Sequence, residues 1–187
     1  MPKTPIRLIQ SLLLTLLAAA LLATLAACKP TYNWRDYSSP DAPFRVMFPD
    51  KPSVHKRHID LDGMPVEMTM TAVDVHGTTF AVGSATAPDA AKAQAALGAM
   101  QTALVRNIGA TVSEQKSASV AAADSAGGAQ GATIDIVASG VQNGTPMKLI
   151  GHFESRDQRF YQVIVIGKEN DLSPEQVEQF IASFKLL

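Results

Sequence analysis

Pairs of turn-forming residues recur between runs of alternating apolar and polar residues, and they constrain this chain more than any other feature. The pairs are Asp62-Gly63, His76-Gly77, Asn143-Gly144 and Arg156-Asp157. Glycine tolerates the positive φ that a two-residue hairpin requires, so Asp-Gly and Asn-Gly are strong hairpin signals. Because consecutive hairpins join neighbouring strands in opposite directions, the sequence predicts a mostly antiparallel sheet.

Seven to nine strands are predicted around these turns. Apolar residues at every second position indicate strands with one buried face. The predicted strands are 34–37, 44–48, 54–61, 64–75, 78–85, 112–122, 132–139, 147–154 and 160–166. The run 160–166 is almost continuously apolar, which is typical of a central strand covered on both faces.

Two helices are predicted from apolar residues at steps of three and four. One starts at Pro88-Asp89 and ends before Gly109, a residue suited to a helix C-terminus. The other starts at Ser173-Pro174, where Gln176 could complete a capping box. We therefore expect an α+β fold whose sheet is covered on both sides.

The first 27 residues read as a secretory leader. Lys3 and Arg7 form a basic start, and the apolar stretch 12–27 follows, interrupted by Thr15 and Thr24. This is the order of a signal peptide. A membrane-spanning helix needs about 20 apolar residues, which this stretch does not reach, so we expect the leader to be cleaved.

The leader ends in Leu25-Ala26-Ala27-Cys28, which contains the only cysteine of the chain. This segment resembles the bacterial lipobox, whose cysteine is acylated and becomes the first residue of the mature protein. The resemblance implies lipid attachment at Cys28, and several acyl chains anchor a protein almost permanently. By the same resemblance, Lys29 in the next position favours the outer membrane over the inner one. We expect 28–33 to be a lipidated tether and 34–187 the folded domain.

Composition narrows the class of the mature chain. Cleavage would leave 160 of the 187 residues, enough for one domain with a hydrophobic core. Fourteen basic residues then stand interspersed among 17 acidic ones, which argues against a nucleic-acid-binding surface. A lone cysteine excludes a disulfide within the chain, so packing must hold the domain together.

Two segments resemble the PsbP family of small secreted proteins. "FRVMFPDKP" at 44–52 matches the family's early strand and turn, and "FIASFKLL" at 180–187 matches its closing helix. The resemblance implies an α-β-α sandwich on an antiparallel sheet over residues 34–187. Proteins with this fold include an extrinsic subunit of photosystem II and a nuclear-transport partner of the GTPase Ran. The resemblance therefore implies a binding or accessory module rather than one common activity.

Two groups of residues are candidates for binding metal. His55 and His58 carry imidazoles, but a separation of three on a strand places them on opposite faces. A second group, whose thioethers could hold Cu(I), consists of Met47, Met64, Met68 and Met70. Their alternation with polar residues favours a buried sheet face instead.

A small hydrolase is the other class that the sequence leaves open. Its site would be assembled from His76 or His152 with a carboxylate and a hydroxyl brought close in space. Ser84 follows a glycine but lacks the second glycine of a nucleophile elbow.

An aromatic group near the tether could belong to the core or face a partner. It consists of Tyr32, Trp34 and Tyr37.

These observations favour a lipid-anchored, non-enzymatic module of the bacterial outer membrane that faces the periplasm. Its expected partners are the membrane, through the lipid on Cys28, and either a protein or a small apolar ligand bound by a sheet face or helix groove. We assign no catalytic residue, metal ligand or cofactor. The alternatives are a small periplasmic hydrolase and a copper-handling lipoprotein.

Overall fold

A computed structural model describes residues 31–120 and 131–187. The leader and Cys28 lie outside these ranges, as does most of the glycine-rich segment 125–131. The elements are, in chain order, β1 Arg35–Ser38, β2 Phe44–Phe48, β3 Ser53–Leu61, β4 Met64–Val75, β5 Thr78–Thr86, α2 Ala90–Asn107, β6 Ala110–Val120, β7 Gly131–Gln142, β8 Thr145–Arg156, β9 Arg159–Lys168, the 3-10 helix η1 Glu169–Asp171, α3 Pro174–Ser183 and β10 Lys185–Leu186. The predicted α+β class is confirmed.

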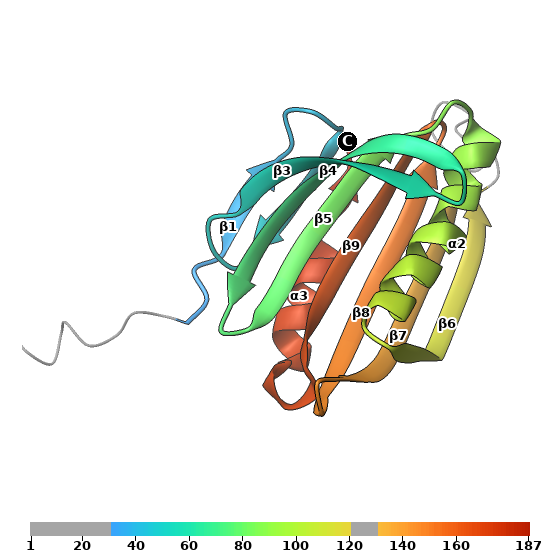
Figure 1. Ribbon diagram of the computed structural model, residues 1–187. Coiled ribbons are helices and arrows are strands. Elements are labelled where there is room, and N and C mark those ends of the chain that lie inside the picture. Colours follow the sequence, from blue (N-terminus) through green and yellow to red (C-terminus); the bar gives the residue numbers. More distant parts are fainter. Residues whose placement is uncertain (1–30, 121–130) are drawn as a thin grey trace, which may run out of the picture. The chain divides into compact units, whose positions relative to one another are not determined.

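Within residues 31–120 and 131–187, ten strands form two antiparallel sheets, where the sequence predicted one. Seven of them follow the order β3-β4-β5-β9-β8-β7-β6 (Figure 1). The other three follow the order β1-β2-β10. The apolar run 160–166 lies in β9, the middle strand of the larger sheet, and its residues Phe160 to Val165 are buried. This confirms the prediction of a central strand covered on both faces.

Positive φ values mark the predicted hairpin turns. Asp62 and Gly63 have φ of 55° and 83°, the signs that a type I′ turn requires at both central residues. The pairs His76-Gly77 and Asn143-Gly144 follow the same pattern. The fourth turn is shifted by one residue, because Arg156 pairs with Arg159 and leaves Asp157 and Gln158 as the turn.

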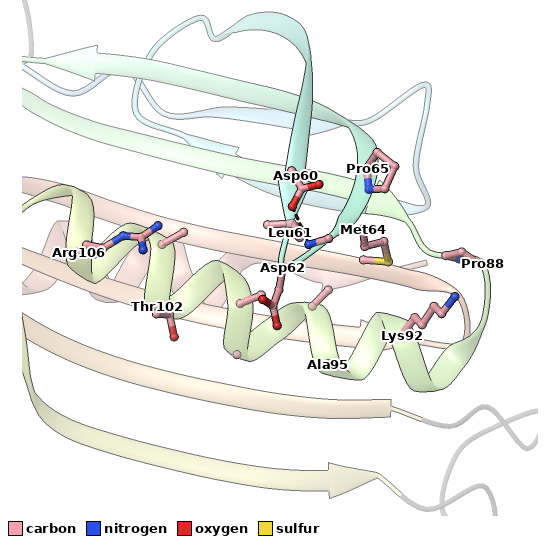
Figure 2. Close-up of a pocket in the computed structure, with 15 residues that line it drawn as sticks. Asp60, Leu61, Asp62, Met64, Pro65, Pro88, Lys92, Ala95, Thr102 and Arg106 are labelled. Carbon is pink, nitrogen blue, oxygen red and sulfur yellow. Dashed lines mark hydrogen bonds between the residues drawn. The ribbon is translucent and has the colours of Figure 1, made fainter.

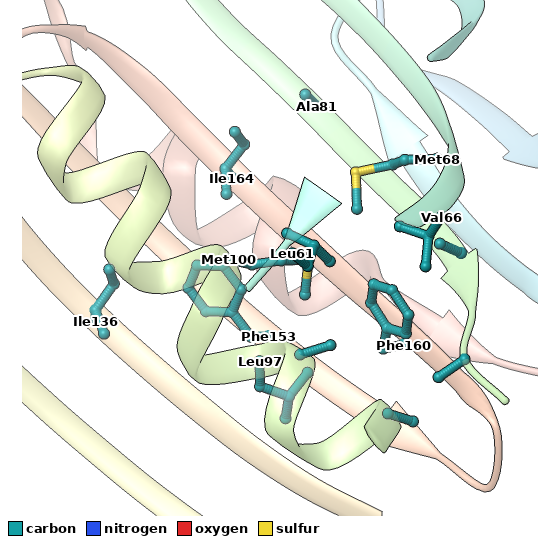
Figure 3. Packing of buried hydrophobic residues seen from close by; sticks show 14 of the residues in the cluster. Leu61, Val66, Met68, Ala81, Leu97, Met100, Ile136, Phe153, Phe160 and Ile164 are labelled. Carbon is teal, nitrogen blue, oxygen red and sulfur yellow. The ribbon is translucent and has the colours of Figure 1, made fainter. Parts of the chain in front are cut away.

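Helix α2 covers one face of the larger sheet. Its N-cap is Asp89, whose carboxylate accepts a hydrogen bond of 2.8 Å from the backbone N–H of Lys92. Its apolar stripe contacts β7, β8 and β9. The core below it is shown in Figure 3 and includes Leu61, Met68, Leu97, Met100, Ile136, Phe153, Phe160 and Ile164.

The opposite face of the larger sheet is covered by α3 and the three-stranded sheet. Phe180 of α3 is fully buried, and its ring centroid lies 5.3 Å from those of both Phe48 and Phe80. The predicted capping box at the start of α3 is wrong. Ser173 makes no side-chain capping bond, and the amide oxygen of Gln176 accepts a hydrogen bond from Trp34 instead.

The two outer strands of the larger sheet are the most exposed. In β3, the side chains from Ser53 to His58 are all exposed. In β6, a register shift between Val112 and Glu114 interrupts the ladder with β7. Charged side chains and bulges of this kind discourage pairing with a further strand.

Candidate functional site

A large hollow among the described residues is a cleft between the β3–β4 hairpin and α2. We call it the hairpin cleft (Figure 2). Its volume is about 970 Å³. It is lined on one side by Asp60, Leu61, Asp62, Gly63, Met64 and Pro65, and on the other by Pro88, Lys92, Ala95, Ala96, Gly98, Ala99, Thr102, Ala103 and Arg106.

Small side chains form the helical wall of the hairpin cleft. A Cβ atom placed on Gly98 would meet no atom within 4 Å, so the space beside this residue is open. Ala95 and Ala103 are exposed on the same wall. Side chains this short let the main chain of a bound segment approach the helix closely.

Charges of opposite sign stand on the two walls. Asp60 and Asp62 come from the hairpin, while Lys92 and Arg106 come from the two ends of the helix (Figure 2). The carboxylate of Asp60 accepts a hydrogen bond of 2.6 Å from the backbone N–H of Gly63, which fixes the turn. Among the residues described, none of these four charged groups has an ion-pair partner within 4.0 Å.

Sequence reasoning did not find the hairpin cleft. Lys92, Ala95, Ala99, Thr102 and Arg106 do recur at steps of three and four on the face of the helix away from its apolar stripe. The signal was incomplete because the second wall comes from a hairpin about thirty residues earlier in the chain.

His152 lies elsewhere, between two carboxylates on β7 and β8. Its Nδ1 is 2.6 Å from Oδ1 of Asp135, and its Nε2 is 3.5 Å from Oε2 of Glu154. Burial alone would lower the pKa of His152, but the hydrogen bonds and charges of Glu154 and Asp135 outweigh it and raise the pKa above its usual value. These contacts stabilise an imidazolium.

A hydrolytic site is not assembled from the predicted residues in the part of the chain that the structure describes. Both ring nitrogens of His152 face carboxylates, so neither faces a serine hydroxyl. Ser155, three residues further along β8, has its side chain on the opposite face of the strand, and its hydroxyl accepts a hydrogen bond from the backbone of Ala132. His76 is exposed in a turn, and Ser84 is buried within β5.

The histidine pair does not converge on one point. His55 and His58 lie on β3, which pairs with β4 in an unbroken register, so their side chains point to opposite faces. Both are exposed, and Nε2 of His58 lies 3.9 Å from a carboxylate oxygen of Glu67. Within residues 31–120 and 131–187, no group of three or more His, Cys, Asp or Glu side chains is placed to hold a metal ion.

The methionines serve packing. Met68 is buried in the core under α2, and Met64 and Met70 pack against that core. The sulfur of Met70 accepts a hydrogen bond of 3.4 Å from the buried amide of Gln162. Met47 lies in the other sheet, on β2. The four thioethers therefore do not form one cluster.

The aromatic group near the tether packs against the domain. Tyr32 and Trp34 are half-buried, and each ring stands edge-on to Phe80 with centroids 6.4 Å and 6.3 Å apart. Tyr37 packs in the same way on Phe48. These rings contribute to the second core, which leaves only part of each surface accessible.

No known protein family and no curated protein matches this chain. None of the helices in the described ranges is long and apolar enough to cross a bilayer.

Proposed function

We propose that this protein is a lipid-anchored, non-enzymatic binding module of the bacterial outer membrane that faces the periplasm. The observation that carries the proposal is the segment Leu25-Ala26-Ala27-Cys28, which follows an apolar leader and stands four residues before Tyr32, where the folded unit begins. Tyr32 is fixed against Phe80, so the acylated cysteine would hold the domain close to the bilayer surface.

The finer fold assignment is part of this proposal. Helix α2 contacts one face of the seven-stranded sheet, and α3 packs with the other face through Phe180 and Val177. This arrangement supports an α-β-α sandwich of the PsbP type. The resemblance to the PsbP family implies a binding or accessory module, which agrees with the role proposed here and defines no activity.

Metabolic labelling with an alkyne fatty acid tests the anchor. The wild-type chain should carry the label and fractionate with the outer membrane, and its mature N-terminal residue should be a lipid-bearing cysteine by mass spectrometry. Cys28→Ser should lose the label, whereas Thr31→Ser should keep it. Retention of the label by Cys28→Ser would refute the acylation.

The hairpin cleft is the proposed binding site for a segment of a partner protein. Its short helical side chains and its charges of both signs, which have no ion-pair partner among the described residues, suit a polar peptide better than a lipid tail. A photo-crosslinking residue at Ala95 or Ala103 should give an adduct of the same mass in intact cells. Gly98→Trp, which fills the cleft, should abolish it.

A crosslinker at Ser117 on the exposed strand β6 is the matched control. Equal adducts from Ser117 and Ala95, or adducts that survive Gly98→Trp, would remove the hairpin cleft from consideration. Neither result would bear on the lipid anchor.

A further inference from the structure

We propose that a second site, a groove between α3 and β8, binds a small apolar molecule that carries one positive charge. We call it the α3 groove; it lies on the face of the larger sheet opposite the hairpin cleft. Its volume is about 470 Å³. It is lined by Glu114, Val137, Lys148, Ile150, Glu169, Leu172, Pro174, Val177, Glu178, Ile181 and Ala182.

The floor and walls of the α3 groove are apolar and incompletely covered. Val137 and Ile150 are cross-strand partners on β7 and β8, and they form the floor. Ile181 of α3 and Leu172 form the wall. All four side chains are only half-buried. An apolar ligand would remove the remaining surface of these side chains from water, which is the main driving force for binding in such a site.

Three carboxylates stand around this apolar surface, each from a different element. Glu114 comes from β6, Glu169 from η1 and Glu178 from α3. In the described part of the chain, none of them has an ion-pair partner within 4.0 Å. Lys148 is the single cation in the lining. The charge around the groove therefore favours a cation and opposes an anion.

A second hollow lies next to the α3 groove, and its charges determine at which end of the groove the positive group of a ligand lies. It shares Ile181 and Ala182 with the α3 groove and contains Arg156 and Lys185. Its one carboxylate, Glu154, already contacts Arg156 and His152. A positive charge is repelled from that end, so the charged group of the ligand lies beside the three glutamates and its apolar part points along α3.

The volume favours a small molecule over a protein helix. Pockets for drug-sized ligands span about 300–1,000 Å³, and the α3 groove lies within this range. A partner helix would need a longer apolar surface. The strands beyond β8 instead carry the polar side chains Asp135, Ser139 and Lys116 on this face, next to the apolar floor.

Two probes with the same alkyl chain and opposite charge test the proposal. Octyltrimethylammonium and octanesulfonate are titrated calorimetrically, below their aggregation concentrations, into residues 29–187, which contain both hydrophobic cores. The ammonium probe should bind about tenfold more tightly. Amide resonances of α3 should shift with it. Equal binding of the two probes, or no binding of the ammonium probe, would overturn the proposal.

Variants separate the apolar and the charged contributions. The double variant Glu169→Gln/Glu178→Gln should lose about fivefold to tenfold in affinity for the ammonium probe and none for the sulfonate. Ile181→Ser should weaken both probes. Glu175→Gln, on the exposed surface of α3 and outside the groove, is the matched control.

An unchanged ammonium affinity in the double variant would show that the glutamates do not select the ligand. Gly98→Trp should leave both titrations unchanged, because the hairpin cleft is on the other face of the sheet. A negative result in the probe titrations would therefore not argue against the proposed lipid anchor or against the hairpin cleft as a binding site.

Discussion

The indole N–H of Trp34 donates a hydrogen bond of 3.1 Å to the side-chain oxygen of Gln176, across 142 positions of the chain. The bond joins the segment just after the proposed tether to the first turn of α3. The Trp34 ring also stands edge-on to Phe80. One residue thus connects the start of the domain both to the central sheet and to the closing helix.

Gln176→Ala should destabilise the protein by about 0.5–1.5 kcal/mol, because the partly buried indole N–H would lose its acceptor. Trp34 is the only tryptophan, so its fluorescence reports both unfolding in urea and the local change. Gln179→Ala, an exposed position on the same helix, serves as the control. Equal free energies of unfolding for the two variants would show that the bond contributes nothing.

Substitution by alanine should change the free energy of unfolding in opposite directions at two glycines. At Gly98 the added methyl group meets open space, so Gly98→Ala should stabilise α2 by about 0.5–1 kcal/mol. At Gly140 the new Cβ would lie 2.7 Å from Cα of Ala110 on the neighbouring strand. Gly140→Ala should cost about 1–3 kcal/mol. Thermal and urea unfolding measure both changes, and a shift of the same sign in both would contradict this reading.

His152 should make stability depend on pH. Its carboxylate neighbours raise its pKa in the folded state above the 6.5 of an unperturbed histidine. The folded state therefore holds the proton more tightly than the unfolded chain. The stabilisation by His152 is fully present below about pH 6.5 and is lost as the pH rises through the folded-state pKa.

The comparison of wild type with His152→Asn across pH 5 to 8 measures this effect. The difference in free energy of unfolding should be largest at the acidic end and should shrink towards pH 8. His58→Asn, at an exposed position beside Glu67, is the control for the removal of a histidine side chain. A difference for His152→Asn that grows with pH would mean that the neutral imidazole is the stabilising form.

His76→Asn should stabilise the β4–β5 hairpin. His76 has a φ of 52° in the first central position of the turn, a conformation that asparagine adopts more readily than most residues. We expect a gain of about 0.5 kcal/mol, a fraction of the usual penalty for this conformation. His76→Val should destabilise the protein, and the opposite order of the two variants in urea unfolding would refute the argument.

The parts of the fold that were predicted correctly depend on local chemistry. Asp62-Gly63 and Asn143-Gly144 identify their turns without reference to the rest of the chain, and Asp89 and Gly109 bound α2 as expected. The central position of β9 was indicated by its own apolar run. In each case a few adjacent residues carry the full signal.

The parts that were not predicted depend on contacts between distant residues. Strand β10 is two residues long and exists because Lys185 and Leu186 pair with Arg45 and Phe44 of β2. Gln176 likewise accepts a hydrogen bond from the indole of Trp34 instead of capping α3, because the tertiary structure brings Trp34 next to it. The lining of the α3 groove comes from β6, β7, β8, η1 and α3, so no single segment could have revealed it.

The position of β9 has a consequence for biogenesis. Strands β3 to β5 and strands β6 to β8 form two separate ribbons that meet only when β9 inserts between them. During synthesis from the N-terminus, both ribbons are complete before residues 159–168 are made, and until then each ribbon has an edge strand without its partner. A stop codon or a protease cut ahead of β9 would therefore release two half-sheets prone to associate with other chains, rather than a shortened but working protein.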